Sequence, residues 1–270
     1  MSKIIKSLHR YPIKSFRGES LKSLRVKFTG FEFDRHWMLV DDKGVFMSQR
    51  RNSRMALIEA RLQGEFLLIK IPNQEIIKSA IEISENSKLS DYVIWQDEIK
   101  ALAVNPKIDQ LISEFLNKPC QLVVMSARQP RTITDSAAKG IVSFADAFPF
   151  LLIGTESLAT LNNKLVKNVT MENFRPNIVI ETTKAHEEDS WQEIQIGEVR
   201  FRNVKLCSRC ILTTVDPKTA ERSQDQEPLS TLITYRKIEQ KIMFGSNLIA
   251  LNEGLIKAED NLKVLSIKTS

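Results

Sequence analysis

Two of the chain's three cysteines lie in the tetrapeptide Cys207-Ser208-Arg209-Cys210, a spacing that is typical of zinc sites and of redox-active dithiols. A structural zinc ion needs four ligands, which usually come as two closely spaced pairs. The sequence has no second pair, because the remaining candidates are isolated from one another: Cys120, His9, His36 and His186. A structural zinc site is therefore disfavoured.

The residues after the pair also disfavour thioredoxin-like chemistry. In such dithiols the first cysteine lies at a helix N-terminus, whose dipole stabilises the thiolate. Ile211–Val215 is rich in β-branched residues and precedes Asp216-Pro217, which predicts a strand that ends in a turn. Two interpretations remain: either the cysteines pack as small apolar side chains, or the cation of Arg209 favours a reactive thiolate beside it.

An extended backbone would separate the two cysteines. Alternation along a strand places Cys207 and Arg209 on one face and Ser208 and Cys210 on the other. One cysteine can then be a ligand while the other packs in the core. Alternation by itself leaves open which cysteine takes which role.

Basic residues in two earlier segments can hold an anion. Lys14 and Ser15 end the segment Tyr11–Ser15 and offer a cation and a hydroxyl group to a phosphate. They lack the glycine-rich sequence of a P-loop, so an exposed turn is the alternative. Arg35 precedes a predicted strand and suits either a bidentate anion site or a surface contact with Asp34.

Arg175 and Asn177 flank Pro176 at the start of another predicted strand. Alone, these residues form an ordinary junction between a loop and a strand. The formal net charge is +6, and lysine and arginine are spread along the chain rather than clustered with aromatic residues. This distribution disfavours nucleic acid as a partner and suits a small anionic ligand.

The composition predicts a folded protein in a reducing compartment. The chain has 270 residues, of which 42% are hydrophobic and 27% charged, so it can form one large or two modest domains. Three cysteines, an odd number, indicate a reducing environment. There is no signal peptide and no apolar run of about 18 residues, so we expect a cytoplasmic protein without membrane contact.

Most of the chain predicts short antiparallel strands, because apolar and polar residues alternate between turn residues. Hairpin turns are expected at Asp42-Lys43-Gly44, Gln63-Gly64 and Gly197-Glu198. The predicted strands are Ser23–Phe28, Trp37–Asp41, Val45–Ser48, Ala56–Leu62, Glu65–Ile71, Tyr92–Trp95, Ile99–Val104, Gln121–Met125, Pro176–Glu181, Ile194–Ile196, Val199–Leu206, Ile211–Val215, Leu248–Leu251 and Leu262–Ile267. The fold class is therefore mainly β, in barrels or sandwiches, with a few helices.

Helical patterns occur at two places. Asn105 and Pro106 form an N-cap and a first helical residue, and apolar residues then recur at helical spacing. A second helix is expected over Thr155–Val166, capped by its first residue. Ser126–Ile141 is polar and aperiodic, which predicts a loop, and the best domain boundary lies around Cys120–Gly140.

Together these segments resemble the MOSC superfamily, whose members bind the molybdenum cofactor. Within it, the chain is similar to the mitochondrial amidoxime-reducing components and to bacterial proteins that detoxify 6-hydroxylaminopurine. The resemblance covers nearly the whole chain and implies an N-terminal β-barrel domain at residues 1–122 and a MOSC β-barrel domain at residues 123–270. It is carried by Tyr11–Ser15, Gly30–Trp37, Phe148–Ile153, Asn173–Ile178, Glu188–Trp191 and Cys207–Pro217.

The resemblance also implies the site. In the family the second cysteine of the pair ligates molybdenum through its soft thiolate, which assigns the metal-binding and catalytic role to Cys210 and a packing role to Cys207. The other cofactor-binding positions that it implies are Lys14, Ser15, Arg35, Asp146, Arg175, Asn177, Ser208 and Arg209, with Asp146 near the metal. Pyridoxal phosphate binding is a further property that is associated with the superfamily.

The implied activity is the reduction of N-hydroxylated compounds such as hydroxylaminopurines and amidoximes, with a role in detoxification. The sequence ends at Ser270 without the four-cysteine ferredoxin domain of some bacterial relatives, so we expect a separate ferredoxin-like or flavoprotein electron donor. The mitochondrial relatives also carry a membrane anchor that this sequence lacks. The alternative within the superfamily is a sulfur-carrier module, as in cofactor sulfurases, with a persulfide on Cys210.

Overall fold

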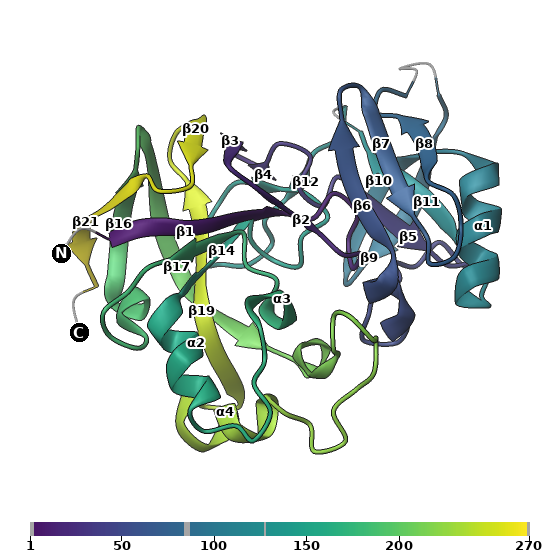
Figure 1. Ribbon diagram of the computed structural model, residues 1–270. Coiled ribbons are helices and arrows are strands. Elements are labelled where there is room, and N and C mark those ends of the chain that lie inside the picture. Colours follow the sequence, from purple (N-terminus) through teal and green to yellow (C-terminus); the bar gives the residue numbers. More distant parts are fainter. Residues whose placement is uncertain (1–2, 84–86, 127, 269–270) are drawn as a thin grey trace.

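The computed structural model describes residues 3–83, 87–126 and 128–268. Within these residues the protein is mainly β with a few helices, as predicted, and it has two lobes (Figure 1). One lobe is a closed barrel that contains both the first and the last strand, and the other holds smaller sheets and the helix α1 (Pro106–Leu116). In the described ranges, no helix combines the length and the apolar character that a bilayer crossing requires.

Seven strands close the barrel in the order β14, β15, β1, β21, β16, β17 and β19, and β19 pairs back to β14. Neighbouring strands are antiparallel except β14 and β15, which are parallel. The strands are β1 (Lys3–Arg10), β14 (Phe150–Gly154), β15 (Ile178–Ile180), β16 (Trp191–Ile196), β17 (Val199–Arg209), β19 (Lys241–Ala250) and β21 (Asn261–Ile267). Closure leaves no free edge among these strands, and their inward side chains form a core that includes Ile5, Leu8, Phe150, Ile194 and Phe201.

The second lobe contains two antiparallel sheets. The first has the order β5-β11-β10-β9 and the second β6-β7-β8. The helix α1 and the inner faces of both sheets enclose a second core, which includes Trp37, Ile69, Ile108 and Leu122. The strands are β5 (Trp37–Val40), β6 (Glu59–Gln63), β7 (Phe66–Lys70), β8 (Ile77–Ala80), β9 (Leu89–Ile94), β10 (Asp97–Ala103) and β11 (Gln121–Met125).

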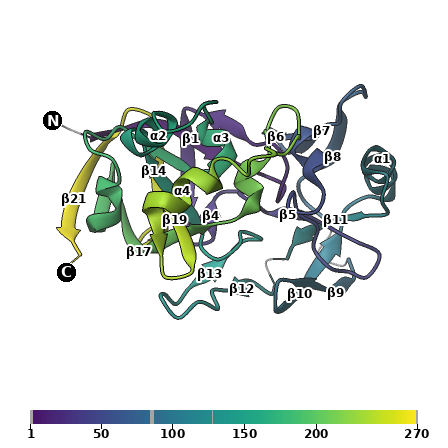
Figure 2. The same cartoon turned by 90° about the horizontal axis from the view of Figure 1, so that it is seen from below.

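The smaller elements connect the lobes or cover the barrel. Figure 2 shows α2, α4, β17 and β19 on the barrel side and β9, β10, β11 and α1 on the other. The remaining strands are β2 (Glu19–Leu21), β3 (Ser23–Lys27), β4 (Gly30–Phe31), β12 (Arg131–Thr132), β13 (Ile141–Val142), β18 (Lys237–Ile238) and β20 (Gly254–Lys257). The helices are α2 (Thr155–Asn162), α3 (Met171–Phe174) and α4 (Leu229–Arg236), with 3-10 turns η1 (Ser53–Leu57), η2 (Glu187–Ser190) and η3 (Ile211–Thr214).

The first strand belongs to the barrel of the second half of the chain. β1 pairs with β15, with Ile5 opposite Ile180, and with β21, with Lys3 opposite Leu262. The barrel is therefore built from residues on both sides of the predicted boundary at 122 and 123. The division of the chain into 1–122 and 123–270 stays a prediction.

Local signals placed several elements correctly. The Asn105 side chain accepts a hydrogen bond from Lys107 N at 2.9 Å, and the helix begins at Pro106, as predicted. Gly64 and Gly197 have φ of 58° and 54°, which suits the two predicted hairpin turns. β11 has the predicted bounds, Gln121–Met125.

Other predictions were wrong. Ile211–Val215 is not a strand: the 3-10 turn η3 occupies Ile211–Thr214, with Cys210 at its N-cap position. The second helix ends at Asn162 rather than at Val166, and Thr155 does not cap it, because its hydroxyl oxygen instead accepts a hydrogen bond from Thr182 N at 3.2 Å. In both places contacts distant in sequence override the local propensity.

Two further segments differ from their predicted strands. Val45–Ser48 makes only isolated bridges, and Ala56–Leu57 lies in the 3-10 turn η1 before β6 begins. The predicted loop at 126–141 contains the two-residue strand β12 and the start of β13. The structure also contains β1, α3 and α4, for which we predicted no regular structure.

Candidate active site

A cavity of about 460 Å³ brings all nine predicted site residues together. They come from five separate parts of the chain: the segment after β1, the residues before β5, those before β14, those before β15, and the end of β17. The nine are Lys14, Ser15, Arg35, Asp146, Arg175, Asn177, Ser208, Arg209 and Cys210. The volume lies in the range of ordinary small-molecule sites.

Irregular pairing of β17 brings the whole Cys207–Cys210 segment to the cavity. The register between β17 and β19 shifts twice, between Asn203 and Lys205 and again between Leu206 and Ser208. Opposite the second shift, Gly245 has φ of 80°, a left-handed conformation that glycine adopts readily. Such bulges change the direction of the following side chains, so simple alternation does not hold here.

Cys207 and Cys210 differ in their surroundings. Arg209 Nη1 donates to Cys207 Sγ at 3.1 Å, and its Nη2 donates to Phe174 O at 2.7 Å. Cys207 also packs against the apolar cluster around Phe174 and Phe244, in addition to lining the cavity. Within the described residues, Cys210 Sγ makes no hydrogen bond, so the thiol that lies at the end of β17 is available to a ligand in the cavity.

Lys14 and Asp146 form an ion pair in the cavity wall, in which the Lys14 side chain is 6% exposed and the Asp146 side chain 54% exposed. Lys14 is almost fully buried, and its Nζ donates to Phe144 O at 2.8 Å and to the Asp146 carboxylate. Burial lowers the pKa of Lys14, and the Asp146 charge partly offsets this effect. Enclosure by protein opposes the ionisation of Asp146, but the charges of Lys14 and of nearby arginines hold its pKa well below the usual range.

Arg35 and Arg175 both lie over one buried aromatic ring, that of Tyr11. Their guanidinium carbons lie 4.3 and 4.2 Å from the ring centroid of Tyr11. Arg35 Nη1 donates to Asp34 at 2.5 Å and to Asn177 Oδ1 at 3.0 Å. Burial raises the pKa of Tyr11 to about 12 and lowers that of Arg175 to about 10, so Arg175 remains a cation at neutral pH.

Three of the nine residues have a backbone conformation that side chains other than glycine rarely adopt. Ser15, Arg35 and Arg175 have φ of 67°, 47° and 55°. Such conformations persist only where the surrounding structure enforces them, and they gather at ligand sites. Arg175 also has a buried Nη2 atom without a hydrogen-bond partner among the described residues.

Several cavity residues were missed by the sequence analysis. Arg50, Asp135, Lys205 and Asn247 also line the cavity, and no motif in the sequence distinguishes them. Phe148 was noted only as part of a longer family segment. With these residues the lining has six cations against two carboxylates: Lys14, Arg35, Arg50, Arg175, Lys205 and Arg209, against Asp135 and Asp146. The cavity therefore suits an anionic ligand.

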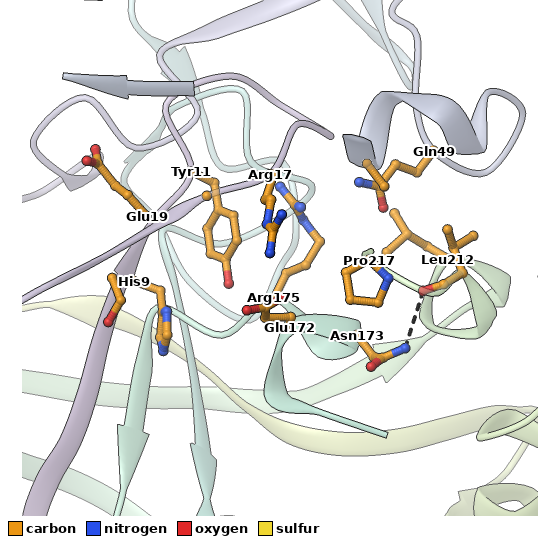
Figure 3. A pocket seen from close by; sticks show the side chains of 14 residues that line it. His9, Tyr11, Arg17, Glu19, Gln49, Glu172, Asn173, Arg175, Leu212 and Pro217 are labelled. Carbon is orange, nitrogen blue, oxygen red and sulfur yellow. Dashed lines mark hydrogen bonds between the residues drawn. The ribbon is translucent and has the colours of Figure 1, made fainter. Parts of the chain in front are cut away.

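A smaller cavity of about 80 Å³ lies next to the first, and Arg175 and Leu212 line both (Figure 3). Its remaining lining includes His9, whose pKa is lowered by burial, and Asn173, whose Nδ2 donates to Val215 O at 3.2 Å. This volume holds only a few water-sized groups. Arg175 thus separates the smaller cavity from the larger one and lines both.

The fold and the site define the class of protein: the chain belongs to the MOSC family. Residues 2–119 match the MOSC N-terminal beta barrel domain, and residues 139–263 match the MOSC domain. The resemblance that the sequence predicted is thus confirmed.

Two relatives illustrate the similarity within the family. Human "Mitochondrial amidoxime-reducing component 1" is 33% identical over 94% of this chain and 81% of its own length. Rat "Mitochondrial amidoxime reducing component 2" is 32% identical over 86% and 72%. Among solved structures, the YUAD protein from Bacillus subtilis covers 97% of this chain and 94% of its own at 12% identity, with a TM-score of 0.45. That last similarity is too low to support an argument.

Proposed function

We propose that this protein is a molybdenum-cofactor-dependent reductase of N-hydroxylated compounds such as amidoximes and hydroxylaminopurines. The observation that carries the proposal is the convergence of nine residues, Cys210 among them, on one cationic cavity. The printed names of two relatives, at 33% and 32% identity, support reduction of an N-hydroxylated group. Pyridoxal phosphate binding stays a prediction of the family resemblance.

The residues present fit the molybdenum cofactor, which carries a phosphate, a pterin and a dithiolene-bound metal. The cavity has an excess of cations for the anionic parts and one thiol without a hydrogen bond for the soft metal. Arg175 Nη2 and Arg209 Nε are buried donors without partners in the described structure, which a bound phosphate or pterin would satisfy. No group of three or more metal-ligating residues occurs in the ranges described, so Cys210 would act as a single protein ligand.

The chain's own residues have separate tasks in this proposal. Cys210 would hold the metal, while Lys14, Ser15, Arg35 and Arg175 would bind and orient the anionic parts of the cofactor. When bound, the cofactor would supply two-electron redox chemistry. The overall reaction converts R–NHOH, two electrons and two protons to R–NH2 and water.

Two side chains are suited to handling protons and hydrogen bonds. Asp146 is an anion at neutral pH because its pKa is held low, so it accepts a hydrogen bond from a substrate N–H or O–H. Lys14 Nζ holds a proton that burial makes easier to release, because its pKa is lowered. The two electrons would come from a separate ferredoxin-like or flavoprotein donor.

The test begins with the full chain expressed in a host that makes the cofactor. We expect bound molybdenum and pterin, and reduction of benzamidoxime or 6-hydroxylaminopurine with an artificial electron donor. Cys210→Ser should abolish turnover, since an alcohol is a poor ligand for the metal, whereas Cys207→Ser is the matched control and should retain most of it.

Full activity of the Cys210→Ser enzyme would contradict the proposal. A protein that carries a persulfide on Cys210 and no molybdenum would instead favour the sulfur-carrier alternative. Mass spectrometry of the purified chain, before and after reduction, separates these two outcomes.

A further inference from the structure

Arg50 lies in the cavity wall and is held against an aromatic pair outside it. Its guanidinium carbon is 4.2 Å from the ring centroid of Trp95, and the Trp95 ring lies 4.5 Å from that of Phe46 at an angle of 56°. Arg50 Nη2 lies 3.6 Å from Asp146 Oδ2, so the same side chain also faces the ion pair with Lys14. Neither Arg50 nor Trp95 was singled out by the sequence.

Trp95 has an unusual backbone for its size. It is the first of the two residues that join β9 to β10, where Ile94 pairs with Asp97. Its φ is 58°, a conformation that such turns normally give to glycine, asparagine or aspartate. A bulky residue in this region is an outlier, and outliers of this kind gather at functional sites. The residue is also 37% exposed.

The backbone of Arg50 is fixed from both lobes. Arg222 Nη2 donates to the carbonyl oxygen of Arg50, and Gln49 Nε2 donates to Ser15 O at 2.7 Å. Among the described residues, the guanidinium group of Arg50 donates no hydrogen bond. Its ion pair with Asp146 spans 3.6 Å. Several of its N–H donors are therefore available at the cavity, on a side chain whose position is set by its neighbours.

We propose that Arg50, supported by Trp95 and Phe46, binds the substrate and selects planar aromatic N-hydroxylated compounds. This inference rests on the proposed function and specifies which part of the substrate the enzyme recognises. The guanidinium carbon lies over the Trp95 ring, and in this proposal the substrate ring stacks on the opposite face of the same guanidinium group, in the order Trp95, Arg50 and substrate. Its N–H groups lie in the plane of the guanidinium group and can donate to nitrogen atoms of the bound ring.

A purely electrostatic role for Arg50 predicts different behaviour. If Arg50 only offsets the charge of Asp146, lysine at this position would serve equally well, and Trp95 would be irrelevant to catalysis. If Arg50 stacks on the substrate, lysine would fail, because a compact ammonium group offers no planar face. Substitution by lysine therefore distinguishes the two roles, because it keeps the charge of Arg50 and removes its planar face.

The experiment compares benzamidoxime, which is planar, with acetamidoxime, which carries the same reacting group on a methyl group. The holoenzyme variants are Arg50→Lys, Trp95→Asn, which suits the left-handed backbone, and Trp95→Phe, which keeps an aromatic ring. Arg54→Lys is the matched control, because Arg54 stacks on Phe115 at 4.4 Å but does not line the cavity.

For Arg50→Lys and Trp95→Asn we expect KM for benzamidoxime to rise roughly tenfold, with kcat and all acetamidoxime parameters within about twofold. Trp95→Phe should restore most of the loss, and Arg54→Lys should behave as wild type. Equal changes in kcat/KM for both substrates would overturn the inference, since that pattern indicates a general structural role.

A binding measurement keeps the inference separate from the proposed activity. Trp37 and Trp191 are 0% and 4% exposed, so quenching of tryptophan emission by a bound ring reports mainly on Trp95. We expect benzamidoxime, and not acetamidoxime, to quench the wild-type holoprotein, and Arg50→Lys to weaken this binding. Quenching without turnover would support the inference and contradict the reductase assignment, whereas turnover of both substrates without quenching or a KM difference would contradict the inference alone.

Discussion

At the scale of single residues, the cavity combines one thiol that makes no hydrogen bond among the described residues, that of Cys210, with more cations than the nearby carboxylates neutralise. Most of these cations are restrained: Arg35 and Arg175 by Tyr11, Arg209 by Cys207 and Phe174, and Lys14 by Phe144. A restrained cation loses little conformational freedom when an anion binds, so its contribution to affinity is retained. Burial lowers the pKa of Lys14, and the charges of Lys14 and nearby arginines outweigh the effect of burial on Asp146 and hold its pKa low.

The Lys14 and Asp146 pair leads to a residue-scale prediction. Lys14→Met removes the strongest of the charges that keep the pKa of Asp146 low, so this pKa should rise. The acidic limb of the pH profile of kcat/KM should then move to higher pH, and the activity near neutral pH should fall by roughly tenfold or more. Steady-state assays from pH 8 down to the lowest pH at which the protein stays folded measure this shift.

Lys205→Met is the matched control, because Lys205 also lines the cavity but pairs with Asp135 instead. Its pH profile should keep the wild-type acidic limb. If both variants lose activity by the same factor at every pH, the Lys14 charge acts only in general anion binding. That result would contradict the role given to Asp146.

At the scale of elements, the irregular pairing of β17 with β19 positions the thiol segment. Gly245 has the left-handed conformation opposite the second register shift, and a Cβ atom added there would lie 2.7 Å from Ile153 Cγ1 and 2.9 Å from Leu152 O. The neighbouring strand thus prevents any side chain at this position. The 3-10 turn η3 then ends the strand and places Cys210 at its N-cap.

Gly245→Ala should destabilise the fold by about 2–4 kcal/mol, from backbone strain and from the clash with β14. Gly64→Ala is the control, because Gly64 also has positive φ but no atom within 4 Å of an added Cβ. That change should reduce stability by about 1 kcal/mol. Urea unfolding of both variants measures the difference, and equal losses would indicate that the clash is relieved without strain.

At the scale of the whole molecule, partly buried histidines couple stability to pH. His36 lies against Phe33 and Trp37, with ring centroids 5.6 and 4.8 Å away, and burial lowers its pKa to about 4. Burial, together with the charge of Arg236, likewise lowers the pKa of His186 to about 4. Both groups have ordinary pKa values near 6.5 in the unfolded chain.

These shifts set the sign of the pH dependence. Between pH 6.5 and 4 the unfolded chain binds more protons than the folded protein, so the free energy of unfolding decreases as the pH falls through this window. Each histidine should reduce stability by about 1–2 kcal/mol between pH 7 and pH 5. Glu188 and Asp189, whose pKa values are raised by burial, act in the opposite direction.

Comparison of variants isolates the histidine effect. In the His36→Gln variant, the decrease in the free energy of unfolding between pH 7 and pH 5 should be smaller by about 1–2 kcal/mol, whatever the effect of the substitution on stability at pH 7. Urea unfolding at pH 7, 6 and 5 gives the slopes. An unchanged slope in the variant would show that His36 does not bind an additional proton on unfolding.

Much of the local structure could be predicted from the sequence. Alternation identified strands such as β3 and β11, and the Asn105 and Pro106 pair identified the start of α1, because both signals depend on neighbouring residues. The sequence also contained the family segments, and all nine residues that they implied line one cavity. What each of the nine binds stays a prediction.

The tertiary structure decided the features that depend on distant residues. Ile211–Val215 has β-branched residues that favour a strand, yet it forms η3, whose backbone is tied to α3 by the bonds from Asn173 Nδ2 to Thr213 O and Val215 O. The position of β1 in the barrel and the Arg50–Trp95 stack at the cavity depend on the same kind of contact. The sequence by itself thus determined the strands, the helix start and the residue types that can do chemistry. Their convergence on one cavity required packing between residues more than a hundred positions apart, which no local pattern records.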